Sequence, residues 1–264
     1  MLFTLFAVAA LIWCAVVLLR TFTRRSSGSR PLIAAGIAVL ILATLSIVSD
    51  LRSVVLRFRA PESDVSVVVN DTGRWLQLAY ANGKTSFVTA NELHVPAGRV
   101  VEVEWRGPAV VGWSAHDFLP VESGRWRFIA NDAGVDDVWL IRLWPAPRYR
   151  RLTIVSDSPA EFARWFVNEA KPADPSAAAF FTSCGCSYCH VIRGVAESPW
   201  KAAPDLTHFA ARRTIAATSL PNRRGFLAGW VVDPPGLKPG TEMPPNRLDP
   251  VVLQKMLNYL ESLR

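Results

Sequence analysis

The stretch CGCSYCH, residues 184–190, places three cysteines and one histidine within seven positions of the chain. The whole chain of 264 residues has only four cysteines, so this cluster holds most of its sulfur chemistry. Two cysteines can form a disulfide, and cysteine and histidine side chains can bind soft metals such as copper or hold haem. The spacing within the cluster and the rest of the chain decide among these three interpretations.

Residues Cys186 to His190 have the spacing C-x-x-C-H, which is typical of covalent haem c attachment. One helical turn places the two thiols where they can form thioethers with the haem vinyl groups, and His190 then points at the iron. A zinc site would need two more ligands, and a redox dithiol would not need the histidine. The remaining cysteine, Cys14, lies in a long apolar run, which excludes a four-cysteine site. The cluster therefore predicts one covalent haem c on Cys186, Cys189 and His190, with Cys184 as a spare thiol.

The second axial ligand of the iron is predicted to be Met243, which lies in LKPGTEMPPN, 53 residues after His190. A loop framed by proline and glycine can aim a thioether at iron, and a His/Met pair suits electron transfer. Of the other methionines, Met1 is the initiator and Met256 lies on the apolar face of a predicted final helix. His208 in APDLTHFAAR is the alternative ligand, and we expect it to make a structural hydrogen bond instead.

Two long apolar runs begin the chain, because residues 1–19 and 31–49 carry no charged side chain. Nineteen residues span about 28 Å as a helix, and a bilayer core needs about 20 apolar residues. These runs predict a transmembrane hairpin in residues 1–60, with helices over about 2–20 and 31–49. A cleaved signal peptide is the alternative for the first run, although that run lacks a basic start. Four arginines between the helices, against three shortly after the second, favour a cytoplasmic loop.

The residue pattern of the remaining chain changes twice, after about residue 60 and after about residue 170. Short valine-rich and aromatic runs, separated by Gly, Pro and Asn turns, predict a β-sandwich over residues 61–170. Ser158, Pro159 and Glu161 predict the capped start of a helix. A short linker over 171–176 and an all-α domain over 177–264 follow. The predicted fold class is therefore a membrane-anchored multidomain chain, with a two-helix hairpin, a β-sandwich and an all-α domain.

The formal net charge of +7 does not predict a nucleic-acid partner. Residues 1–60 hold seven arginines and one aspartate, so much of the excess flanks the predicted membrane helices. Charges at such positions set topology or meet anionic lipid head groups. No run of Lys and Arg interleaved with aromatics resembles a nucleic-acid surface.

Residues 177–264 resemble a class I cytochrome c domain in CSYCH, the APDL segment, the KPGTEMPP loop and the final helix. The whole chain resembles subunit II of haem-copper oxidases, in the form with a fused cytochrome c. TANELHVPAGR, residues 89–99, looks like a segment of that family's cupredoxin domain, and DSPAEFARWFVNEAKPA, residues 157–173, looks like its helix and exit linker. The resemblance implies a cupredoxin-like sandwich and a haem c whose axial ligands are His190 and Met243. It also implies a multi-pass location in a bacterial inner membrane, with the C-terminal domains in the periplasm.

In that family the β domain usually holds a dinuclear copper centre, CuA, through C-x₃-C-x₃-H-x₂-M and one upstream histidine. Such a centre needs two bridging thiolates. The corresponding residues 134–155 contain no Cys, His or Met, and residues 61–176 contain no cysteine. Gly112 stands at the place of the upstream histidine, and His94 and His116 are expected to be structural. CuA is therefore predicted to be absent.

The resemblance implies an electron-transfer subunit of a respiratory haem-copper oxidase. Electrons would come from a soluble cytochrome c or another redox donor and pass through haem c to a large catalytic subunit, within a complex that includes other oxidase subunits. The chain itself is not expected to be catalytic, because a six-coordinate haem leaves no open position on iron. Two alternatives remain at this point: the haem c subunit of a nitric oxide reductase-type complex, and a stand-alone membrane-tethered cytochrome c shuttle.

Overall fold

The computed structural model describes residues 63–108, 110–113, 118–121, 124–142, 148–174, 178–200 and 202–264. The described residues all fall within one compact unit, Glu62–Arg264. The two predicted membrane spans, 2–20 and 31–49, lie outside the described residues, and so does His116.

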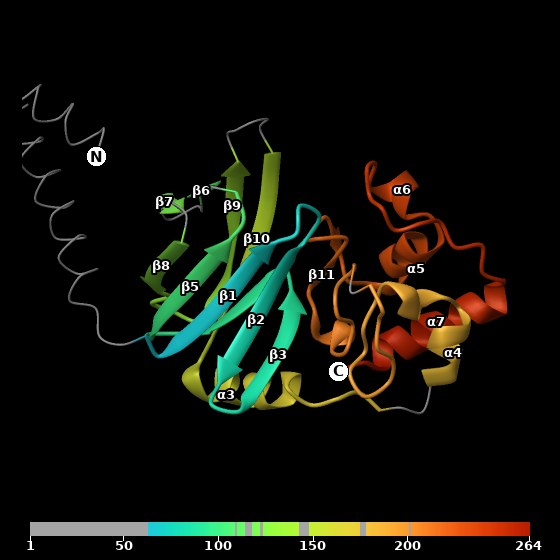
Figure 1. The fold of residues 1–264 in the computed structure, drawn as a ribbon, viewed down its shortest axis with the longest axis horizontal. Coiled ribbons are helices and arrows are strands. Elements are labelled where there is room, and N and C mark those ends of the chain that lie inside the picture. The colour runs from blue at the N-terminus through green and yellow to red at the C-terminus, as the bar shows by residue number, and fades with distance from the viewer. Residues whose placement is uncertain are drawn as a thin grey trace, which may run out of the picture. The chain divides into compact units, whose positions relative to one another are not determined.

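Two five-stranded sheets make up the first half of the compact unit (Figure 1). The first sheet has the order β3 (Thr85–Ala90), β2 (Leu76–Asn82), β1 (Val65–Asp71), β5 (Val100–Arg106), β8 (Gly124–Ile129). The second has the order β4 (Glu92–Pro96), β10 (Arg148–Asp157), β9 (Gly134–Arg142), β6 (Val110–Trp113), β7 (Phe118–Val121). The pairs β1–β5 and β4–β10 are parallel, and the other pairs are antiparallel.

Alternating side chains explain how the two sheets share one core. In β5, Val101 and Val103 are fully buried, whereas Glu102 and Glu104, which alternate with them, point to the other face. The buried valines join Leu140 and other residues of the second sheet in one apolar cluster. Full burial of each such side chain contributes roughly 1.5–3 kcal/mol, so this cluster is the main stabilising feature of the sheets.

Helix α3 (Pro159–Glu169) follows β10 and lies at one end of the strands (Figure 1). Its predicted capping box is confirmed: the Glu161 backbone N–H donates to Ser158 Oγ at 3.4 Å, and the Ser158 N–H donates to the Glu161 carboxylate at 3.2 Å. Trp165 lies edge-on to Tyr80 and Phe87, with ring centroids 5.1 and 5.6 Å apart. The helix therefore closes the end of the first apolar cluster with aromatic contacts.

The C-terminal half combines short helices with a small ladder. Its elements are α4 (Ala178–Ser183), η2 (Cys186–Tyr188), η3 (Phe209–Ala211), β11 (Thr214–Ile215), β12 (Leu220–Pro221), α5 (Arg224–Val232), α6 (Pro234–Leu237) and α7 (Pro250–Ser262). They surround a second apolar cluster that includes Phe181, Ile192 and Met256. Met256 is 1% exposed, which confirms its predicted place in the core.

The prediction of an all-α fold for residues 177–264 is wrong. β11 pairs antiparallel with β12, and three of the four residues between them, Ala216, Ala217 and Thr218, have left-handed φ values of 54°, 52° and 67°. This left-handed turn reverses the chain and brings the two short strands together. Strands of two residues carry no detectable periodicity, so the sequence pattern did not reveal the ladder.

The predicted membrane-anchored fold class and multi-pass inner-membrane location are corrected as well. Within the described part of the chain, no helix is long and apolar enough to cross a membrane. The longest helix there, α7, has 13 residues, or about 20 Å at roughly 1.5 Å per residue, against a hydrocarbon core of about 30 Å. The described residues are instead rich in sheet, with short helices.

Candidate functional site

The CGCSYCH segment forms a tight turn at the end of α4. Gly185 adopts a left-handed φ of 75°, which a residue without Cβ reaches at no steric cost, and η2 begins directly after it. The backbone N–H groups of Cys189 and His190 both donate to the carbonyl of Cys186, at 3.3 and 3.0 Å. The turn therefore brings the three residues of the predicted attachment motif together, and the three described cysteines are all free thiols.

The His190 ring is fixed by one backbone acceptor. His190 Nδ1 lies 2.8 Å from the carbonyl oxygen of Pro204. A carbonyl only accepts, so Nδ1 must carry the proton and Nε2 must carry the lone pair. Burial lowers the pKa of His190, which keeps the imidazole neutral at pH 7. A neutral ring with its other nitrogen hydrogen-bonded to a carbonyl is the form in which histidine binds metals.

The position of Pro204 is itself set by backbone hydrogen bonds. The N–H of Ala203 donates to the carbonyl of Cys189 at 3.2 Å, and the N–H of Leu206 donates to that of Val191 at 2.8 Å. These bonds hold the APDL segment, residues 203–206, beside the turn formed by Cys186–His190, which we call the attachment turn. Sequence reasoning missed the role of Pro204, because a main-chain acceptor leaves no signature in side-chain patterns.

The thiol of Cys186 is held in its neutral form. Burial, followed by the nearby Cys184, raises the pKa of Cys186 to about 11. The thiolate is the form that attacks disulfides and binds soft metals, so a raised pKa disfavours a redox dithiol and a copper–thiolate site. A neutral, unpaired thiol on the same turn as a neutral histidine fits covalent haem attachment better.

Met243 lies between α6 and α7 in a segment without regular structure, and it is half-buried. The segment is fixed at Thr241, whose N–H donates to the Lys238 carbonyl at 3.2 Å, and at Asn246, whose N–H donates to the Val232 carbonyl at 3.0 Å. The helices α5 and α7 on either side pack in the same apolar cluster as Cys186. No hydrogen bond joins Met243 to His190 within the described residues, so its role as axial ligand stays a prediction.

The two other histidines within the described residues, His94 and His208, make structural contacts. His208 is 3% exposed, and its Nε2 lies 3.0 Å from the Lys171 carbonyl, which confirms the expected structural hydrogen bond. His94 bonds Asp157 at 2.9 Å and stacks on Trp165 at a centroid distance of 4.3 Å. Across the described ranges, no group of three or more His, Cys, Asp and Glu side chains could hold a metal ion. The predicted absence of CuA remains a prediction.

Two exposed aromatic side chains lie on or near the Cys186–His190 turn. Tyr188 and Trp200 are 62% and 71% exposed, and their ring centroids are 6.3 Å apart. The Ser198 hydroxyl donates to the Tyr188 carbonyl at 2.8 Å and so fixes the backbone between them. The Cys186–His190 turn thus offers free thiols, a neutral histidine and an aromatic ring, and these residue types fit haem c.

This chain was compared with models of known protein families and with curated proteins, and neither comparison finds a match.

Proposed function

We propose that the chain is an electron-transfer protein that carries one covalent haem c, attached to Cys186 and Cys189, with His190 and Met243 as the axial ligands of the iron. The observation that carries this proposal is the contact of His190 Nδ1 with the Pro204 carbonyl, which leaves Nε2 as the ligand atom. Haem c supplies a one-electron iron couple, and His/Met ligation raises its reduction potential.

The protein's own contribution is to prepare the ligand. The Pro204 carbonyl holds the imidazole in one tautomer and one orientation, and burial disfavours protonation of His190 at Nε2. The backbone carbonyl fixes the tautomer and orientation of the ring, and burial keeps the ring neutral. The ring therefore does not need to reorganise when it binds iron. Fixed ligands of this kind suit electron transfer, which is fastest when little moves between the two oxidation states.

The resemblance of residues 89–99 and 157–173 to subunit II segments supports a place in a larger complex. The chain accepts electrons from a soluble cytochrome c or another donor and passes them to the large catalytic subunit of a respiratory haem-copper oxidase. No thiolate-bridged copper pair takes part in this route, since residues 61–176 contain no cysteine. With His190 and Met243 as ligands, the haem would have no open position for oxygen, so oxygen chemistry would occur in the partner.

Covalent attachment is tested by producing the chain in a host that matures c-type cytochromes, then denaturing it and assaying haem by staining and mass spectrometry. We expect haem to stay with the wild-type polypeptide and with Cys184→Ser. The double variant Cys186→Ser/Cys189→Ser should release its haem on denaturation. Haem that is extractable from the wild-type chain would contradict the proposal.

The place in an oxidase is tested by purifying the chain with its partner subunits and measuring donor oxidation. We expect oxygen-consuming activity in the wild-type complex and its loss in His190→Ala, with the complex still assembled. Full activity of the His190→Ala complex would show that electrons do not pass through this haem. Reduction of nitric oxide, without oxygen consumption, would assign the partner to the alternative class.

A further inference from the structure

The segment that carries Met243 lies between α6 and α7 and covers residues 238–249, which form neither helix nor strand. We call it the ligand segment. On the side toward α7 it is tied to α5, because the side-chain amide of Asn246 donates to the Val231 carbonyl at 3.1 Å. On the other side of Met243, two contacts lead from the ligand segment to the β-sandwich and its neighbouring turn.

The first contact is an ion pair made by Glu242, the residue directly before Met243. The Glu242 carboxylate lies 2.5 Å from Nη2 of Arg74, which belongs to the turn between β1 and β2. The two side chains are 61% and 53% exposed, so water screens their attraction. An exposed pair of this kind favours the closed contact by a factor of up to about five.

The turn that presents Arg74 is held by its own hydrogen bonds. The Thr72 hydroxyl donates to the Trp75 carbonyl at 2.9 Å and accepts the Arg74 N–H at 3.3 Å. The Gly73 N–H donates to the Asp71 carboxylate at 2.8 Å. The backbone of Arg74 is therefore fixed, and the ion pair joins the ligand segment to a stiff part of the sandwich.

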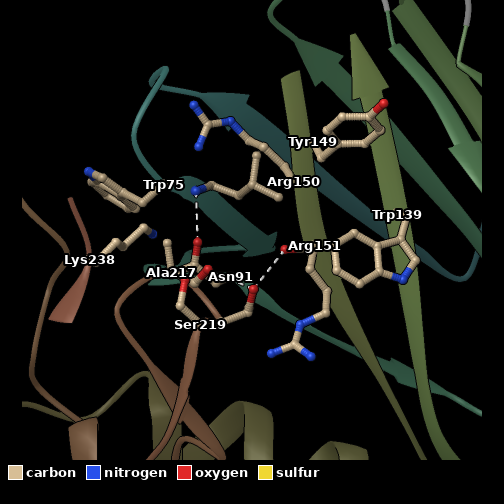
Figure 2. A pocket seen from close by; sticks show the side chains of 11 residues that line it. Trp75, Asn91, Trp139, Tyr149, Arg150, Arg151, Ala217, Ser219 and Lys238 are labelled. Carbon is tan, nitrogen blue, oxygen red and sulfur yellow. Dashed lines mark hydrogen bonds between the residues drawn. The ribbon is translucent and has the colours of Figure 1, made fainter. Parts of the chain in front are cut away.

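The second contact is made by Lys238, at the start of the ligand segment. Its Nζ donates to the Ala216 carbonyl, in the β11–β12 turn, at 2.6 Å. That turn is held to the second sheet, because the Thr218 hydroxyl lies 3.4 Å from the Arg151 carbonyl (Figure 2). A half-buried hydrogen bond from an ammonium group is charge-assisted, and losing it shifts an equilibrium by on the order of tenfold.

The two contacts meet at one place in the fold. Lys238 and Trp75, the neighbour of Arg74, both line a cavity of about 330 Å³ beside the β11–β12 turn. Trp75 is only 7% exposed, and Figure 2 shows it on the same side of this cavity as Lys238. The start of the ligand segment and the β1–β2 turn therefore come together here, in agreement with the ion pair a few residues further along.

We propose that Arg74 and Lys238 are positioning residues for the axial ligand Met243. Arg74 acts through Glu242 and Lys238 acts through the Ala216 carbonyl, and together they keep the thioether on the iron. This inference rests on the proposed haem function. It gives the β-sandwich, which has no cysteine for a copper pair, the task of restraining a ligand of the iron. Loosening the ligand segment raises the fraction of chains whose sixth iron position is open.

Added imidazole tests this on the ferric, haem-loaded chain, because imidazole binds the iron only after Met243 has left it. Its apparent affinity rises in proportion to the open fraction. Arg74→Gln and Glu242→Gln should each strengthen imidazole binding about two- to fivefold, and the double variant should add nothing further. Lys238→Met, which keeps the apolar stem and loses the donor, should strengthen it about tenfold. Loss of the ferric charge-transfer band that marks methionine ligation reports each displacement.

A charge swap and a distant ion pair are the controls. Arg74→Glu/Glu242→Arg should restore the wild-type affinity for imidazole, which a general loss of structure would not do. Arg127→Gln removes a comparable pair on the outward face of the first sheet, where Arg127 Nη2 lies 2.6 Å from the Glu102 carboxylate. It should leave imidazole binding unchanged. Circular dichroism and melting curves establish that each variant is folded, and the exposed Arg74 and Glu242 variants keep the test decisive if Lys238→Met is not.

Hydrogen exchange of the peptide covering residues 238–249 is measured on the chain as purified, so it reads the restraint with or without haem. Arg74→Gln and Lys238→Met should exchange this peptide faster than the wild type, and Arg127→Gln should not. Haem-loaded variants that bind imidazole as the wild type does would overturn the positioning role and leave the haem assignment standing. A haem-free chain would overturn the haem function, and with it the ligand role, even if the variants exchange faster.

Discussion

The carboxylate of Glu92 accepts hydrogen bonds from the backbone N–H and the hydroxyl of Thr214, at 2.8 and 2.9 Å, across 122 residues of sequence. The same carboxylate accepts the Arg213 N–H at 2.9 Å, and Glu92 is only 3% exposed. Hydrogen bonds to a buried anion are short and strong. The pair therefore joins β4 of the second sheet to β11 of the C-terminal half.

Replacing Glu92 with glutamine should destabilise the whole unit. One carboxylate oxygen becomes an NH₂ group, which faces N–H donors and cannot accept from them. We expect a loss of about 2–4 kcal/mol in the free energy of unfolding, measured by urea denaturation. Glu197→Gln, on an exposed residue, should change it by less than about 0.5 kcal/mol. Equal stability of Glu92→Gln and Glu197→Gln would contradict the stabilising role of the Glu92 hydrogen bonds to Arg213 and Thr214.

Glu169 should make stability depend on pH in the direction opposite to most carboxyl groups. Burial raises its pKa above the ordinary 4.5, against the opposing charges of Arg212 and other cations. The folded chain then holds this proton to higher pH than the unfolded chain, so its contribution to stability is present below pH 4.5 and is lost as pH rises through the raised pKa. Glu169→Gln should therefore melt higher than the wild type at pH 7, with a gap that closes toward pH 4.

Glu161→Gln provides the control of opposite sign. Hydrogen bonds from Ser158 lower the pKa of Glu161, so its contribution is present above pH 4.5 and is lost as pH falls. This variant should melt lower than the wild type at pH 7 and approach it in acid. If the melting temperatures of Glu169→Gln and Glu161→Gln, each relative to the wild type, changed with pH in the same direction, the raised pKa of Glu169 and the lowered pKa of Glu161 could not both be right.

Met243→His should lower the reduction potential of the haem-loaded chain by on the order of 0.1 V or more, because a thioether ligand stabilises ferrous iron better than imidazole does. A spectroscopic redox titration measures the shift. Met256→Leu is the matched control: it removes another methionine, buried in the core, with little change of volume. A potential that moves with Met256 and not with Met243 would exclude Met243 as the ligand.

Asn91 tests the cost of holding a non-glycine residue at positive φ. Asn91→Gly loses only the hydrogen bond to the Leu76 N–H, a cost of about 1–3 kcal/mol. Asn91→Ala loses the same bond and also places a Cβ at φ 63°, which adds about 1–2 kcal/mol. Chemical denaturation should therefore rank the wild type above Gly and Gly above Ala, and the reverse order of the two variants would refute the argument.

Local rules predicted the features that depend on neighbouring residues. The capping box at Ser158 and Glu161, the core position of Met256 and the structural bond of His208 all follow from spacing and residue type. The compact turn at Cys186–His190 also follows from its motif.

Long-range joints could not be predicted in this way. Glu92 and Pro204 act on or through the main chain of distant segments, and backbone groups are the same at every position. The β11–β12 ladder depends on three left-handed residues, none of them glycine, where propensity favours other conformations. The cavity beside the β11–β12 turn is lined by residues of β9, β10 and that turn, which lie far apart in sequence. Only the folded chain brings such groups together.

Because Glu92 bonds main-chain N–H groups, the contact does not depend on the side chain of Arg213. The side chain of Arg213 takes no part in its bond to Glu92, so any residue other than proline at position 213 keeps that donor. Substitutions at position 213 other than proline should therefore leave the hydrogen bond to Glu92 in place, whatever the side chain. A protein engineer could graft a different C-terminal module here, provided that its connecting strand offers two consecutive N–H groups to the same carboxylate.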